Sequence, residues 1–114
     1  MTEKPLAGHR TCTIALRKMR EFPDVFNRLA VPVLLETLGR PLGFWTGVAG
    51  QQNQLIHLSG YDDFADSERR SQARDRHPSF PAYRSASAHL TTAQEIRIIR
   101  APGMQLHIPG WSFQ

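Results

Sequence analysis

The chain alternates between short stretches of apolar residues with period two and longer stretches in which apolar residues recur every three or four positions. Residues 11–16 follow the first pattern and predict a strand, whereas residues 21–38 carry an apolar stripe typical of a helix. Pro32 interrupts this stripe and should kink the helix or split it. Residues 41–48 and 54–61 alternate on either side of a Gly/Gln/Asn turn, which predicts a β-hairpin.

The second half of the chain continues with two helical segments and one strand. Residues 64–76 predict a helix that lies shallowly on the surface, because few of its side chains are large and apolar. His77-Pro78 should end this helix, and Ser79 should cap a short helix from which Tyr83 projects. Alternation returns over residues 92–100, which predict the last strand.

The resulting β-α-β-β-α-β order predicts an α+β, ferredoxin-like fold over residues 10–102. In such a fold a four-stranded antiparallel sheet carries its helices on one face. Residues 1–9 predict a flexible N-terminal arm, and residues 103–114 an apolar tail that must dock on a surface. Both faces of the strands carry apolar residues, so a second copy laid sheet to sheet would close a barrel. The pattern therefore predicts a homodimeric α/β-barrel and leaves open whether dimers associate further.

Composition narrows the classes of function. The 114 residues suit one domain with 40% apolar and 21% charged residues. The net charge of +4 is dispersed, and the densest basic cluster, at residues 69–76, is interleaved with acidic residues, which disfavours a nucleic-acid partner. No apolar run approaches the roughly 20 residues of a membrane span, and the first residues lack a signal peptide, so we expect a cytoplasmic protein. The lone Cys12 excludes an intrachain disulfide and predicts a buried, inert thiol.

Several stretches together resemble a known family. They are Gly43-Phe44-Trp45-Thr46, Ile56-His57-Leu58, Gly60-Tyr61-Asp62, and Ala65-Asp66-Ser67-Glu68-Arg69-Arg70. In order and spacing they resemble the NIPSNAP family over about residues 10–102. The resemblance implies a dimeric α/β-barrel, related in fold to cofactor-free monooxygenases, haem-degrading proteins and stress-responsive barrel proteins, with no common reaction established. Two positions depart from the family pattern: His77 stands where an Asp is frequent, and Ser59 where an aromatic residue is frequent.

His57 is the candidate catalytic residue. It lies in mid-strand, where it would act as an acid/base group or as a haem or metal ligand, or else as a hydrogen-bonded core histidine. Trp45 has glycines two residues away on either side, which either open a pocket around the indole or let the indole fill the core. The five histidines show no metal-ligand spacing, so we expect no metal site.

The charged residues of the last strand offer further candidates. Glu95 and Arg97 share a face and would pair across the two-fold axis, or Arg97 or Arg100 would meet a ligand carboxylate. Neither a nucleophile elbow nor a phosphate-binding glycine loop is present in the sequence.

The sequence therefore predicts a small hydrophobic or aromatic ligand and no cofactor. The predicted cleft combines the following side chains: Trp45, His57, Tyr61, Tyr83 and Arg97. Two other classes stay open. One is an enzyme, either a cofactor-independent monooxygenase or a haem-handling protein. The other is a protein–protein interaction module that uses the C-terminal tail.

Overall fold

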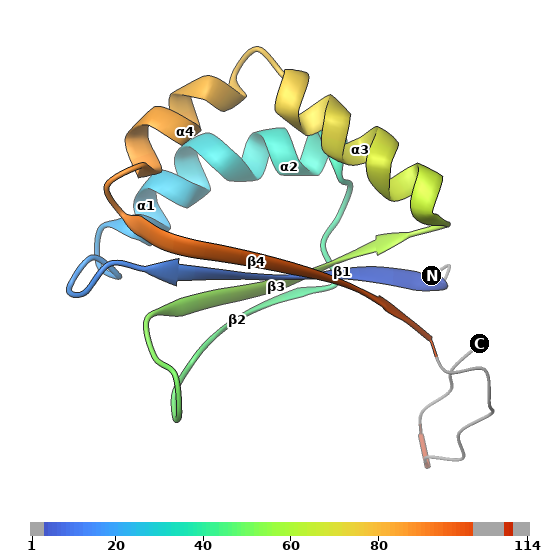
Figure 1. Ribbon diagram of the computed structural model, residues 1–114, viewed down its shortest axis with the longest axis horizontal. Helices are drawn as coiled ribbons and strands as arrows, with labels where there is room; N and C mark the ends of the chain where they lie inside the picture. The colour runs from blue at the N-terminus through green and yellow to red at the C-terminus, as the bar shows by residue number, and fades with distance from the viewer. Residues whose placement is uncertain (1–3, 102–108, 111–114) are drawn as a thin grey trace.

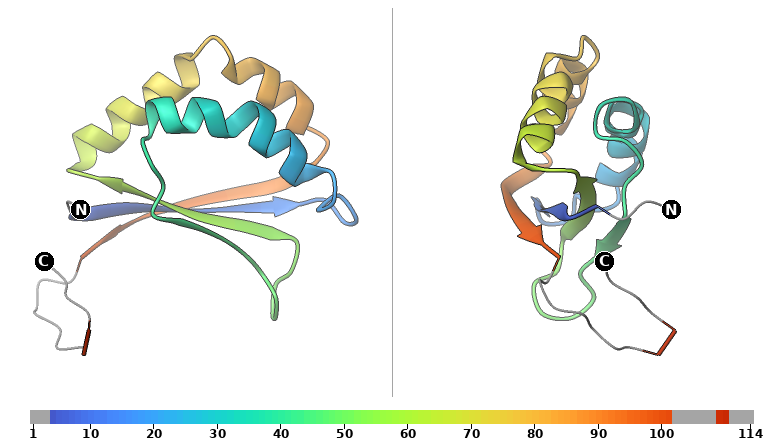
Figure 2. Two further views of the ribbon diagram at one scale, coloured as in Figure 1. Left: turned by 180° about the vertical axis from the view of Figure 1, so that it is seen from behind. Right: turned by 90° about the vertical axis from the view of Figure 1, so that its right-hand side faces the viewer.

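The core of the fold is a four-stranded antiparallel sheet with all helices on one of its faces (Figures 1 and 2). The computed structural model describes residues 4–101 and 109–110. The strands are β1 (Leu6–Ile14), β2 (Gly43–Thr46), β3 (Gln54–Tyr61) and β4 (Thr91–Arg100). They lie in the order β2-β3-β1-β4, so β1 is central and pairs with both β3 and β4. The predicted ferredoxin-like α+β fold is confirmed.

The first helical region is split by a widened turn, as Pro32 predicted. α1 (Phe22–Val25) leads into the π-helical turn η1 (Phe26–Ala30) and then into α2 (Val31–Thr37). The N–H of Val31 bonds to the carbonyl of Phe26, five residues back. The wider turn places Pro32 in the first turn of α2, where a proline is tolerated because the N–H groups of a first turn have no partner within the helix.

A polar cluster joins the end of α2 to the start of α3 (Phe64–Arg76). Asp63 caps α3 by accepting the N–H of Asp66 at 2.7 Å. The buried Asp66 carboxylate accepts the N–H of Asp62 and the guanidinium of Arg70, and Arg70 also donates to the carbonyl of Leu38. The acidic and arginine residues at this position therefore hold two helices together.

The last helix, α4 (Phe80–Ser87), packs with η1 over the sheet. Its N-cap is Ser79, but the hydroxyl of Ser79 makes no capping bond; instead its N–H donates to Nδ1 of His77 at 3.1 Å. The core gathers the apolar residues of the helices and of the covered face of the sheet, and its largest fully buried side chains are Phe22, Val33 and Leu90.

Several strand boundaries differ from the sequence prediction. β1 spans Leu6–Ile14 rather than residues 11–16, so residues 6–9 belong to the sheet and not to an arm. Gly8 permits this, because the ring of Tyr61 occupies the space that a Cβ would need. β2 is shorter than predicted and spans only four residues. Nearly all of the predicted C-terminal tail lies outside the described residues. Within the described part of the chain, no helix has the length and apolar character needed to cross a membrane.

Candidate ligand cavity between the sheet and the helices

His57 lies on the face of β3 that the helices cover. Its register partners are Arg10 on β1 and Phe44 on β2. Only 4% of the residue is exposed. The ring stacks on Phe44, with centroids 5.1 Å apart and planes 13° apart, and meets Phe26 edge-on at 6.1 Å. The register of the β2–β3 hairpin and the π-helical turn thus fix the orientation of the imidazole.

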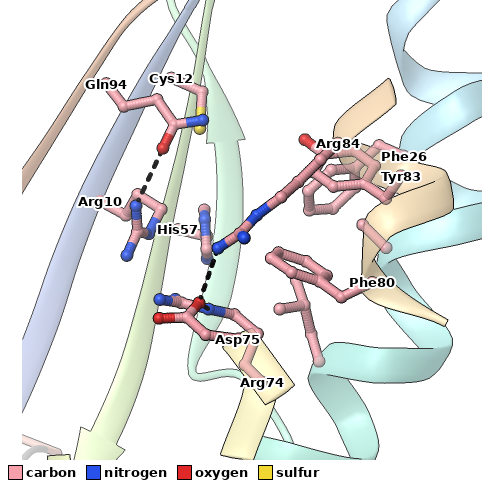
Figure 3. Close-up of a pocket in the computed structure, with 12 residues that line it drawn as sticks. Arg10, Cys12, Phe26, His57, Arg74, Asp75, Phe80, Tyr83, Arg84 and Gln94 are labelled. Atoms are coloured by element: carbon pink, nitrogen blue, oxygen red, sulfur yellow. Dashed lines mark hydrogen bonds and ion pairs between the residues drawn. The ribbon is translucent and has the colours of Figure 1, made fainter. Parts of the chain in front are cut away.

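A cavity of about 110 Å³ lies next to His57, between the sheet and the helices (Figure 3). The sheet contributes its floor, η1 and α2 one wall, and α3 and α4 the other. The lining residues are Arg10, Cys12, Phe26, Ala30, Leu34, His57, Arg74, Asp75, Phe80, Tyr83, Arg84 and Gln94. The cavity therefore combines aromatic walls with a small set of polar groups, as ligand sites commonly do.

Two polar side chains of the lining, His57 and Tyr83, are both uncharged at neutral pH. Burial, and then the positive charges of Arg10, Arg74 and His9, lower the pKa of His57 to about 4. Burial raises the pKa of Tyr83 to about 12, so its phenol keeps its proton. The site thus offers a neutral imidazole and a hydroxyl donor.

The ring nitrogens of His57 make no side-chain hydrogen bond within the described part of the chain, yet none of the described side chains has a fully buried polar atom without a partner. These nitrogens therefore keep a small accessible surface beside the cavity that His57 lines, and they are free to accept from, or donate to, a bound molecule.

Three arginines surround the same cavity. Arg10 donates to the side-chain oxygen of Gln94 at 3.2 Å, and burial followed by repulsion from Arg74 lowers its pKa. Arg74 and Arg84 both approach one oxygen of Asp75, at 3.0 and 3.1 Å. Figure 3 shows the Arg84 side chain reaching from α4 toward Asp75.

The structure divides the five residues of the predicted cleft between two faces. His57 and Tyr83 line the cavity. Tyr61 is buried on the same covered face but packs against Gly8 and lies outside the cavity lining. Trp45 and Arg97 lie on the opposite face, because Trp45 pairs with Ile56 and Arg97 with His9 in the sheet register. The indole of Trp45 lies over Gly43, so that glycine accommodates the ring instead of opening a pocket.

Sequence reasoning missed the charged part of the cavity. Arg10 shares its face of β1 with Cys12 and Ile14, and a charged residue in an otherwise apolar row is a signal of a special site. No such signal marks the other charged lining residues, which are Arg74, Asp75 and Arg84, because exposed helices commonly carry similar charges.

The residues around His57 do not fit haem. Phe44 covers one face of the imidazole, Phe26 packs against its edge, and the cavity is far smaller than a porphyrin. A haem iron could reach His57 only after the helices moved away from the sheet. Among the described residues, no group of three His, Cys, Asp or Glu side chains is placed to hold a metal ion.

Comparison with known families decides the relationship. The sequence profile of the NIPSNAP family matches residues 8–103, most of the chain. The chain belongs to the NIPSNAP family. No curated protein sequence matches it.

Solved structures of NIPSNAP proteins share the fold. An uncharacterised NIPSNAP-like domain protein from Burkholderia xenovorans is 24% identical and superposes with a TM-score of 0.81, covering 99% of this chain and 97% of that one. A NIPSNAP family protein from Agrobacterium tumefaciens is 21% identical, with a TM-score of 0.81 and coverage of 86% and 93%.

A more distant likeness reaches beyond the NIPSNAP family. A protein from Nitrosomonas europaea, named as a candidate antibiotic biosynthesis monooxygenase, is 11% identical, with a TM-score of 0.61 and coverage of 88% of this chain and 92% of that one. The likeness is one of fold.

Proposed function

We propose that this NIPSNAP protein binds a small apolar or aromatic molecule in the cavity beside His57. The observation that carries the proposal is that the lining of this cavity combines aromatic side chains with two neutral polar groups, His57 and Tyr83. Aromatic walls provide most of the contact area for such a ligand, and the few polar groups orient it.

The volume limits the size of the ligand. An apolar cavity of about 150 Å³ in another protein holds benzene. The cavity here, of about 110 Å³, therefore suits a molecule with one ring or a short chain.

We propose that the functional unit is a dimer closed across the uncovered face of the sheet. That face carries Trp45, which is 52% exposed, and Ile99, which is 38% exposed, together with Ile56 and Leu58. Monomeric proteins rarely leave an apolar surface of this kind in water. A second copy laid on it would bury these residues and complete a barrel.

The charges on the uncovered face suit this arrangement. Glu95 and Arg97 lie on the same face of β4 and are opposite in sign. A two-fold axis would bring Glu95 of one subunit near Arg97 of the other, which would neutralise both on burial. The ligand cavity lies on the helix side, so pairing through the sheet leaves it within each subunit.

The binding proposal is tested by filling the cavity from α2. Leu34 lines the cavity, whereas Leu35 is 50% exposed and does not. We expect Leu34→Trp to abolish the ligand-induced NMR shifts of the His57 and Tyr83 rings on titration with phenol or benzyl alcohol. Leu35→Trp should preserve them. Equal binding by both variants, or shifts confined to Trp45, would place the ligand elsewhere and refute the proposal.

One observation favours a second candidate function, a cofactor-independent monooxygenase. A neutral His57 beside an aromatic cavity can accept a hydrogen bond from the hydroxyl of a phenolic substrate and so orient it. The fold likeness to the Nitrosomonas protein agrees with this reading. The monooxygenase hypothesis predicts that the protein consumes oxygen in the presence of phenol and that His57→Gln abolishes this consumption. Unchanged consumption in that variant would remove the enzyme reading.

A further inference from the structure

The charges around the cavity are unequal. Three guanidinium groups, of Arg10, Arg74 and Arg84, face one carboxylate, of Asp75, while His57 is neutral, which leaves a net charge of +2. This positive charge affects the pKa values of two lining residues. In addition to burial, Arg74 lowers the pKa of Arg10, and Arg10 and Arg74 lower the pKa of His57. An apolar neutral ligand would leave this repulsion in place.

Arg10 is the group least compensated. Among the described residues it has no carboxylate within ion-pair distance, and its hydrogen bond goes to the neutral amide of Gln94. A partly buried guanidinium without a counter-ion is costly, and a carboxylate that arrives with a ligand would remove that cost.

Asp75 shows that a carboxylate fits beside these arginines. One of its oxygens lies 3.0 Å from Arg74 and 3.1 Å from Arg84. Arg74 is held against the protein, with 14% of its side chain exposed, whereas Arg84 is 58% exposed and stacks over the ring of Phe80 at 4.9 Å. Arg84 can therefore leave Asp75 for a ligand while Arg74 keeps that carboxylate paired.

We propose that the ligand is a small carboxylic acid whose carboxylate pairs with Arg10 and whose single ring or short chain lies among Phe26, Phe80 and Tyr83. This inference rests on the proposed binding function and adds the chemical class of the ligand. The planar fork of a guanidinium matches a carboxylate in geometry as well as in charge. Asp75 then acts as a competitor for Arg84 and limits how tightly the acid binds.

The test compares benzoate with benzamide, which share ring and size but differ in charge. Isothermal titration of the full-length protein should show benzoate binding at least about tenfold more tightly, because hydrogen bonds between charged groups are stronger than neutral ones. Arg10→Gln should abolish this preference. Arg28→Gln removes the same charge from a position that is 60% exposed and outside the cavity lining, and it should preserve the preference.

A third variant is expected to increase the affinity for benzoate rather than reduce it. Asp75→Asn removes the competing carboxylate and should tighten benzoate severalfold while leaving benzamide unchanged. A variant that merely damaged the fold would weaken both ligands, so the opposed effects separate charge recognition from loss of structure.

The outcomes distinguish the two proposals. If benzoate and benzamide bind with equal affinity and Leu34→Trp blocks both, the proposal of a carboxylic-acid ligand is wrong, whereas the proposal of a binding cavity beside His57 stands. A preference for benzoate that survives Arg10→Gln would also overturn the proposal of a carboxylic-acid ligand. Binding of neither compound, nor of phenol or benzyl alcohol, would contradict both proposals.

Discussion

Each face of the sheet carries a few residues of the kind that the other face usually holds. The face covered by helices carries Arg10, His57 and Ser59, all polar, with the two last buried. The uncovered face carries exposed Trp45 and Ile99. Polar groups inside and apolar groups outside are the two departures from ordinary packing that call for an explanation.

Each departure points to a different role. Buried polar groups that face a cavity are suited to a ligand, because a ligand can complete their hydrogen bonds and balance their charge. Exposed apolar residues on the uncovered face of a sheet are suited to another protein surface, which we propose is a second copy. The comparison therefore supports our proposal of ligand binding on the helix side and assembly on the sheet side.

The largest expected effect comes from a charge placed at the centre of the uncovered face. Leu58→Lys should turn the dimer into a monomer at micromolar concentration, because an unpaired ammonium would be buried at the interface. Sedimentation velocity measures the mass, and Val48→Lys, at an 86% exposed loop position, should leave a dimer. If the Leu58 variant stays dimeric, the interface lies elsewhere.

The next prediction concerns the covered face and acid. Unfolded His57 takes up a proton near pH 6.5, but the folded protein does so only near pH 4. Stability from neutral His57 is therefore full above about pH 6.5 and falls by up to about 3 kcal/mol as the pH drops to about 4. Burial is the main cause of this dependence, and the positive charges of Arg10, Arg74 and His9 strengthen it.

Urea unfolding at fixed protein concentration, repeated between pH 4 and 7, measures the effect. His57→Gln should flatten the profile across this window. His89→Gln serves as control, because 63% of the His89 side chain is exposed, and its profile should match the parent chain. A parent profile that is already flat would contradict the proposed neutral, buried state of His57.

A smaller effect on stability is expected at the polar cluster that joins the end of α2 to the start of α3. The N–H of Asp62, and then Arg70, lower the pKa of Asp66, so its contribution is present above about pH 4 and is lost as the pH falls through the lowered value. Asp66→Asn should cost about 2 kcal/mol. Asp24→Asn breaks a matched i,i+4 pair with Arg28, 3.9 Å long and exposed, and should cost only a few tenths of a kcal/mol.

Chemical denaturation of the two variants, at pH 7 and at pH 3, checks this prediction. Equal losses at the two sites would mean that the buried cluster adds nothing beyond an ordinary surface pair. Neither variant should change the mass of the assembly or the ligand affinity, since both sites are remote from the two faces compared above.

The smallest expected effect comes from removing one oxygen atom on the helix side, which should alter ligand binding but not assembly. Tyr83→Phe removes the hydroxyl of a residue that lines the cavity and should weaken a hydrogen-bonding ligand such as phenol severalfold. It should leave the dimer and its stability nearly unchanged. A matched titration with toluene, which offers no hydrogen bond, should give the same affinity for both proteins.

The sequence predicted the local elements well and their mutual register poorly. β3 was predicted with its observed bounds, since alternation and the flanking turn are local signals. The start of β1 was missed because Ala7 and Gly8 carry no strand signal, and only pairing with β3 and β4, far along the chain, makes residues 6–9 a strand.

The same limit explains the candidate site. His57 and Tyr83 were singled out from strand position and residue type, and the structure brings them to one cavity. Trp45 was grouped with them because period-two alternation does not reveal which side of one strand faces which side of the next. The pairing of Phe44 with His57 settles that question and sends Trp45 to the opposite face.

The most direct test of the division between faces is the stoichiometry of ligand in the assembly. Native mass spectrometry of gently purified protein, with and without benzoate, reports the mass of the assembly and the number of bound ligands in one spectrum. The account predicts twice the chain mass with up to two ligands, one for each subunit cavity. A single ligand per dimer would place the site at the interface, and a monomer would contradict the role of the uncovered face.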